Sequence, residues 1–133
     1  MDRNVQAREL LKADRFATLT GIVIEHVDDG EVVCTLALDT QHCNARGVAM
    51  GGVLFTLADF AAAAAANCEA VEWVSLNSSI HFLAPANGKK IECRCTPIKR
   101  GRTTALFQSN ITDSDSGRLL AVVETTMTRL VTA

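Results

Sequence analysis

The sequence predicts an α+β fold in which an antiparallel sheet of about six strands curls around one long central helix. Two observations lead to this prediction. Segments in which apolar and polar side chains alternate recur through the chain and are joined mainly by short turns. One alanine-rich segment, residues 51–67, consists of strong helix formers and is apolar on nearly every side, as expected for a helix packed closely on a flat surface.

The first half of the chain supplies a helix and a hairpin before the central helix. Residues 2–16 carry four basic residues with three acidic residues interleaved, which favours a packing helix over a targeting segment. Residues 22–27 and 31–38 are predicted strands joined by the turn Asp28-Asp29-Gly30. The second strand should present one apolar face, formed by Val32, Cys34, Leu36 and Leu38.

The second half of the chain is predicted to contain the other four strands. Apolar residues from Val74 to Phe82 alternate with polar ones, and Ala84-Pro85-Ala86-Asn87-Gly88 ends this strand. Residues 90–96, 103–112 and 118–131 follow, separated by turns at residues 100–102 and 113–117. We expect an antiparallel meander, with the central helix inserted between the second and third strands.

Length and composition limit the classes of protein. The 133 residues suit a single domain, 1–133, and no apolar run reaches the roughly 20 residues that span a bilayer. A net charge of −2, with aromatic residues at 5% and no Tyr, disfavours nucleic acid as a partner. The five cysteines lack C-x-x-C spacing, so we expect free thiols, no metal site and a reducing, cytoplasmic location.

The start of the central helix is a candidate oxyanion site. Gly51 and Gly52 follow the polar loop 39–50 and open the helix. The first N–H groups of a helix have no intrahelical partner, and glycine leaves them open to a substrate oxygen.

Asp59 is the only ionisable residue between positions 53 and 66. A carboxylate among apolar side chains is costly unless it has partners or a task, so Asp59 is a candidate catalytic group. The alternative is that Thr56, Asp59, Ala63 and Asn67, which recur at roughly helical spacing, form a plain solvent-facing stripe. Composition by itself leaves both interpretations open.

The pattern His-x-Asn-x-x-Gly-x-x-x-Gly-Gly at residues 42–52, followed by Leu-x-x-Leu-Ala-Asp at residues 54–59, resembles the hotdog-fold acyl-CoA thioesterases of the PaaI-like family. The resemblance implies that Asp59 is the general base or nucleophile and that Gly51 donates its N–H to the thioester oxygen. It further implies that Asn44 orients or polarises the carbonyl and that Ser75 helps to hold the attacking water. Acyl-CoA is then the substrate, and no metal or organic cofactor is required.

Further binding residues follow from the same resemblance. His42, Met50 and Gly52 would shape the substrate site, although His42 has no assignable chemical role. Arg100 and Arg102 are candidates for the phosphates of coenzyme A, with Lys89, Lys90 and Lys99 nearby. A solvated basic turn is the alternative for this hairpin.

Spacing along the helix makes an oligomer part of the hypothesis. Gly51 and Asp59 are eight residues apart, which is about 12 Å along a helix axis, so one thioester carbon cannot touch both. The glycine of one subunit must therefore meet the aspartate of another. We expect a homo-oligomer, a dimer at minimum, with a tetramer also compatible.

Two departures from related patterns define the alternatives. The family usually has His directly before the Gly-Gly pair, whereas this chain has Met50, which leaves a non-catalytic acyl-CoA-binding hotdog protein as the rival hypothesis. Hotdog hydratases place a His five residues after their helical Asp, and here that residue is Ala64, which disfavours hydratase activity.

Overall fold

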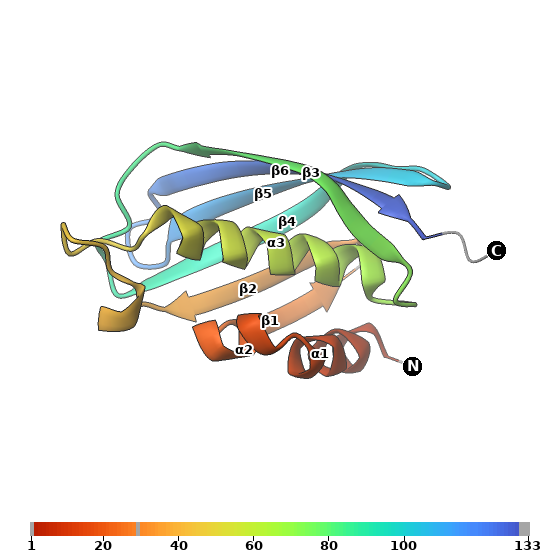
Figure 1. Ribbon diagram of the computed structural model, residues 1–133, viewed down its shortest axis with the longest axis horizontal. Helices are drawn as coiled ribbons and strands as arrows, with labels where there is room; N and C mark the ends of the chain where they lie inside the picture. Colours follow the sequence, from red (N-terminus) through yellow and green to blue (C-terminus); the bar gives the residue numbers. More distant parts are fainter. Residues whose placement is uncertain (1, 29, 131–133) are drawn as a thin grey trace.

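Helix α3 lies across one face of a six-stranded antiparallel sheet in the computed structural model, which describes residues 2–28 and 30–130 (Figure 1). The α+β fold predicted from the sequence is confirmed. The helices are α1 (Arg3–Ala13), α2 (Arg15–Thr20), the short 3₁₀ helix η1 (Thr40–His42) and α3 (Gly51–Asn67). The strands are β1 (Val23–Asp28), β2 (Glu31–Ala37), β3 (Trp73–Phe82), β4 (Lys90–Arg100), β5 (Thr104–Asp113) and β6 (Leu119–Arg129).

The strand order is β1-β2-β4-β5-β6-β3, which corrects part of the predicted meander. Strands β4, β5 and β6 follow one another as expected. Strand β3 does not pair with β4 but joins the far edge beside β6. The reason is the long connection through α3, which crosses the sheet and delivers β3 to the opposite side (Figure 1).

The core lies between α3 and the inner face of the sheet. Val32, Cys34 and Leu36 of β2 are buried there as predicted, and the alternating residues Ile91, Cys93 and Cys95 of β4 face the same way. The six consecutive buried or half-buried alanines after Phe60 explain the close approach, because a methyl side chain leaves the helix backbone near the strands. Val33 and Thr35 are also buried, so β2 is covered on both faces.

One stripe of α3 remains outside this core, formed by Gly52, Phe55, Thr56, Asp59 and Ala63. Asn67, expected on the same stripe in the solvent-facing interpretation, is instead buried. Its amide nitrogen donates to the carbonyls of Ala63 and Trp73, and its Oδ1 accepts from the N–H groups of Glu72 and Trp73. Asn67 therefore ties the end of α3 to β3 and has no part in the site.

The N-terminal segment forms two helices where the sequence predicted one. The break falls at Asp14, whose carboxylate accepts from the N–H of Ala17 and caps α2. Helix α1 covers the β1 edge of the sheet, because Asn4 both donates to the Val27 carbonyl and accepts from the Val27 N–H. The β1 edge is thereby closed by side chains.

Two predicted features fall partly outside the described residues. Asp29, in the turn predicted between β1 and β2, and Val131, at the predicted end of the last strand, are not described. The tight connections between β4 and β5 and between β5 and β6 lie where the sequence placed them. Within the described chain, no helix is both long enough and apolar enough to cross a membrane.

Candidate active site

The loop between β2 and α3 is folded back on itself and held by His42. His42 is buried, and its Nδ1 accepts from the N–H of Asp39, so its Nε2 donates to the carbonyl of Thr20 at the end of α2. Cys43 then pairs with Ala49, and the N–H of Met50 donates to the carbonyl of His42. Both ring nitrogens of His42 are thus used within the protein, and its role is to fix the loop beside α2.

The first turn of α3 presents two free backbone donors. Met50 occupies the N-cap position but makes no side-chain capping bond. Within residues 2–28 and 30–130, neither the N–H of Gly51 nor that of Gly52 has an acceptor, whereas the N–H of Val53 donates to the Met50 carbonyl. The open helix N-terminus predicted from the sequence is therefore present, with its donors available to an anionic oxygen.

Two apolar side chains lie directly against these glycines. A Cβ atom at Gly51 would come within 2.8 Å of Cζ of Phe82, and one at Gly52 within 2.7 Å of Cε of Met50. A side chain at either glycine would therefore displace the exposed ring of Phe82 or the exposed end of Met50, and access to the N–H groups is the stronger reason for glycine at these positions. Phe82 was not among the predicted site residues, because nothing in the sequence links the end of β3 to the start of α3.

Asp59 lies two turns further along the exposed stripe of α3, half-buried among apolar neighbours. Burial raises the pKa of its carboxyl group, a hydrogen bond from Ser75 acts in the opposite direction, and the negative charge of Asp14 adds to the increase. The Ser75 hydroxyl donates to Oδ1 over a long 3.5 Å. The structure thus brings Asp59 and Ser75 together.

Asn44 lies in the tip of the loop before α3. Its Oδ1 accepts from the N–H groups of Arg46 and Val48, which holds the tip closed. In the part of the chain that the structure describes, its amide nitrogen Nδ2 has no acceptor. Asn44 is therefore a structural residue through its oxygen and a potential donor through its nitrogen.

The structure does not bring Gly51 and Asp59 together within one chain. Both belong to the same unbroken helix, and eight residues separate them by about 12 Å along its axis. The helix places both on or beside the exposed stripe, so each can face a neighbouring molecule.

The basic hairpin between β4 and β5 lies beside the C-terminal end of α3, away from Met50. The guanidinium group of Arg100 donates to the carbonyls of Ala65 and Ala66, each over 3.0 Å, and lies over the ring of Phe107. Arg100 therefore has a structural task at the C-terminus of α3, which the sequence did not indicate. Arg102 is exposed on the turn itself.

The remaining candidates for chemistry are the cysteines and possible metal ligands. Cys43 is exposed, while burial raises the pKa of Cys34 to about 12 and that of Cys95 to about 11. Such buried thiols remain protonated and are poor nucleophiles. Among the residues described, no three His, Cys, Asp or Glu side chains lie close enough to hold a metal ion.

The amino-acid sequence matches a known protein family and several named relatives. Residues 46–120 match the thioesterase superfamily. Acyl-coenzyme A thioesterase PaaI of Escherichia coli K12 is 30% identical over 106 residues, which cover 79% of this chain and 76% of that protein. Human acyl-coenzyme A thioesterase 13 is 29% identical over 118 residues, which cover 86% and 84%.

Solved structures agree with the fold throughout the chain. The E. coli PaaI protein from the phenylacetic acid degradation operon superimposes with a TM-score of 0.87 at 24% identity and covers 98% of this chain and 97% of that one. A point mutant of the phenylacetic acid degradation protein PaaI from Thermus thermophilus gives a TM-score of 0.80 at 28% identity, covering 86% and 98%.

Proposed function

This chain belongs to the thioesterase superfamily, and we propose that it hydrolyses acyl-CoA thioesters to a free acid and coenzyme A. One observation carries the proposal: α3 presents two free N–H donors at its start and a half-buried carboxylate of raised pKa two turns later. These are the two groups that acyl transfer to water needs, an oxyanion site and a base. The names of the relatives support acyl-CoA as the substrate class.

In the general-base route, the Asp59 carboxylate takes a proton from a water molecule as the water oxygen attacks the thioester carbonyl carbon. The carbonyl oxygen becomes negative and accepts hydrogen bonds from the N–H of Gly51, with Asn44 Nδ2 and the Gly52 N–H as further donors. The C–S bond then breaks, the thiolate of coenzyme A leaves, and the proton held by Asp59 passes to it. Ser75 orients the carboxylate. Removing one such oxyanion donor typically costs about 2.7–4 kcal/mol of transition-state stabilisation.

Asp59 could instead attack the carbonyl carbon directly, giving a mixed anhydride that water hydrolyses. A single turnover in ¹⁸O-labelled water separates the two routes. The general-base route puts the label only into the released acid. The nucleophilic route, with water attacking the anhydride at the aspartyl carbon, leaves the label in the carboxylate of Asp59.

We infer that the complete site contains residues of two subunits, because the axial separation of Gly51 and Asp59 prevents one chain from supplying both. Strand β3 offers the surface for this pairing. It bonds to β6 on one side, and its other edge carries the exposed side chains of Val74 and Leu76. Asn67 of α3 binds the backbone of Trp73 at the start of β3, but beyond Trp73 no side chain of the described residues bonds to the backbone of β3, whereas Asn4 and Arg8 of α1 both bond to β1.

Subunit complementation tests the shared site. Asp59→Asn and Gly51→Pro should each be inactive as pure proteins, because the first lacks the base and the second lacks the N–H while keeping a residue accepted at the first helical position. Mixed and exchanged, they should recover about a quarter of wild-type turnover, since about half of the dimers are mixed and each has one intact site. No recovery despite proven exchange would reject the shared site.

A non-catalytic acyl-CoA-binding protein is the second candidate, and Met50 is the observation that favours it. The thioether Met50, which cannot donate a hydrogen bond, stands where the family usually has His. Release of thiol from short, long and aryl acyl-CoA esters, measured with and without a chelator, decides between them. We expect turnover that Asp59→Asn abolishes and that the chelator leaves unchanged. Tight binding without thiol release would favour the binding protein.

A further inference from the structure

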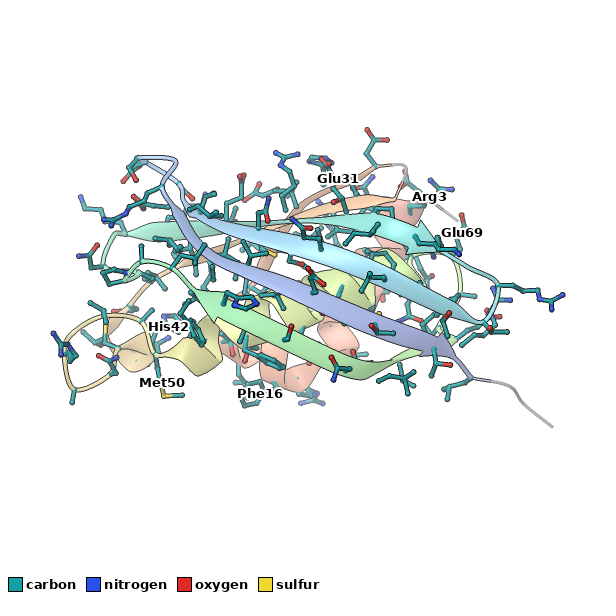
Figure 2. The ribbon with its side chains drawn as sticks, turned by 90° about the horizontal axis from the view of Figure 1, so that it is seen from above. Arg3, Phe16, Glu31, His42, Met50 and Glu69 are labelled. Carbon is teal, nitrogen blue, oxygen red and sulfur yellow. The ribbon has the colours of Figure 1, made fainter. Side chains whose placement is uncertain are left out.

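A second cavity lies on the α2 side of the first turn of α3, separate from the catalytic carboxylate. It has a volume of about 380 Å³, and its walls include Phe16, Leu19, His42, Met50, Gly52 and Val53. Figure 2 shows Phe16 and Met50 along the same lower edge of the molecule, with His42 close to Met50. The cavity is therefore a surface groove bordered by α2, by the loop that His42 holds and by the start of α3.

Several contacts hold the α2 wall in place, although the helix has only six residues. Asp14 caps its start, Gly21 at φ 103° closes its end in the left-handed conformation, and His42 Nε2 binds the carbonyl of Thr20. Ala17 is buried and faces the core. The position of α2 is thus fixed by polar contacts and one small side chain.

Phe16 and Leu19 are displayed by this fixed helix and are not packed into the core. They are 69% and 81% exposed, and their spacing of three residues places them on the same face of α2. Met50, across the cavity, is 54% exposed. Three large apolar side chains that remain exposed around one cavity indicate a site for an apolar ligand.

The cavity adjoins the proposed oxyanion site, since Gly52 lines it and carries one of the two free N–H groups. A thioester whose oxygen binds these donors has its acyl group within reach of the cavity. A larger cavity of about 540 Å³ lies on the other side of Gly51, but Phe82 and Leu83 at the end of β3 line it, on the edge assigned to the partner subunit.

We propose that the cavity formed by Phe16, Leu19 and Met50 binds the acyl chain of the substrate, which makes this chain selective for medium-length aliphatic or aryl acyl groups over acetyl. The inference rests on the proposed function for the identity of the ligand. A volume of about 380 Å³ falls at the lower end of the range of small-molecule sites, roughly 300–1,000 Å³. Met50, in place of a polar residue, keeps the cavity mouth apolar.

Calorimetric binding of non-hydrolysable thioether analogues of acyl-CoA, from two to twelve carbons, tests the inference without requiring turnover. Affinity should rise about fourfold for each methylene until the cavity is filled, as expected for burial of about 0.8 kcal/mol per methylene. In the double variant Phe16→Ser/Leu19→Ser the rise should fall below about twofold per methylene. Val71→Ser, which removes another exposed apolar side chain, is the matched control and should keep the wild-type slope.

A variant that fills the cavity provides an independent test, because it should shorten the preferred acyl chain instead of weakening the dependence of affinity on chain length. With Leu19→Trp, the analogue that binds most tightly should have a shorter chain, because the indole occupies part of the volume.

An unchanged gain in affinity per methylene in the double variant would overturn the inference. So would loss of the oligomer in light scattering with the slope retained, since Phe16 and Leu19 would then be subunit contacts. Chain-dependent binding without thiol release would keep the inference and reject hydrolysis.

Discussion

In the proposed mechanism, Asp59 would serve activity at the expense of stability. Burial raises its pKa, so the charged carboxylate is less stable in the folded protein than in the unfolded chain. Protonation therefore favours the folded state. The favourable contribution is complete below the ordinary Asp pKa of about 3.9 and is lost as the pH rises through the raised value.

Asp59→Asn should accordingly lower kcat by at least about 10²-fold while raising Tm at pH 7. The gain in Tm should shrink as the pH falls and vanish below about pH 3.9, where the wild-type carboxyl is protonated in both states. Thermal unfolding of the two proteins from pH 3 to pH 8 measures this. In wild type, kcat/KM should fall on the acid side at a pKa above the ordinary Asp value. An equal Tm difference at all pH values would contradict the assignment.

Met50→His restores the residue type that the family usually has before the Gly-Gly pair. Met50 makes no capping bond, and only its terminal methyl approaches Gly52, so the change should not disturb α3. We expect turnover of acetyl-CoA to be retained or increased. If Met50 lines the acyl cavity, affinity for long-chain analogues should fall in the same variant. Thiol release and calorimetry on one preparation measure both effects. Loss of turnover of both acetyl-CoA and a long-chain acyl-CoA would contradict the expectation that His is accepted at position 50.

Among the secondary-structure elements, α3 differs at its two ends in whether side chains bind its free backbone groups. Its N-terminus lacks a side-chain cap, whereas its C-terminus is closed by Arg100 and by Asn67. The positive guanidinium group also suits the negative end of the helix dipole. The helix is thus anchored by side chains at its C-terminal end, and its N-terminal N–H groups remain available to a ligand.

Arg100→Ala and Arg102→Ala separate structure from recognition in the basic hairpin. Arg100→Ala should lower the free energy of unfolding by about 1–2 kcal/mol, through loss of the bonds to Ala65 and Ala66. Arg102→Ala should leave stability unchanged and, if the turn binds coenzyme A phosphates, raise KM more than it lowers kcat. Denaturant unfolding and steady-state kinetics on both variants check this. An unchanged KM for Arg102→Ala would leave the hairpin as a solvated turn.

For the whole molecule, the two edges of the sheet explain why a dimer is expected. Side chains of α1 close the β1 edge, while the ten-residue strand β3 at the other edge carries exposed apolar side chains. Open apolar edges promote pairing with another chain. Strand β3 also supplies Ser75, which donates a hydrogen bond to Asp59 of the α3 stripe, so the proposed subunit contact and the proposed catalytic carboxylate lie on neighbouring surfaces.

Leu76→Lys should therefore yield a monomer without thioesterase activity. Leu76 is 63% exposed and lies at the irregularity in the pairing of β3 with β6, so a lysine there should not disturb the core. Light scattering at the assay concentration, together with thiol release, measures both properties. Val71→Ser serves as the control for loss of an exposed apolar residue. An active monomer would exclude the shared site.

The sequence by itself determined the local structure. Alternation and turn residues located the strands, and the alanine-rich run gave α3 its observed bounds, because these signals arise from neighbouring residues. It also indicated the open start of α3 and the isolated Asp59, since both depend on positions within one helix. The pairing of β3 with β6 was not predicted, because sequence order favours neighbouring strands while the α3 crossover decides otherwise.

Only the tertiary structure decided which side chains share a surface. In the folded protein, Arg100 bonds to the C-terminal end of α3 and His42 bonds to the carbonyl of Thr20. Phe82 lies against Gly51, and Phe16 and Leu19 line one cavity with Met50. Each of these contacts joins residues far apart in the chain. No periodicity encodes such contacts, because they follow from how α3 and α2 pack on the sheet and not from the conformational preferences of any one segment.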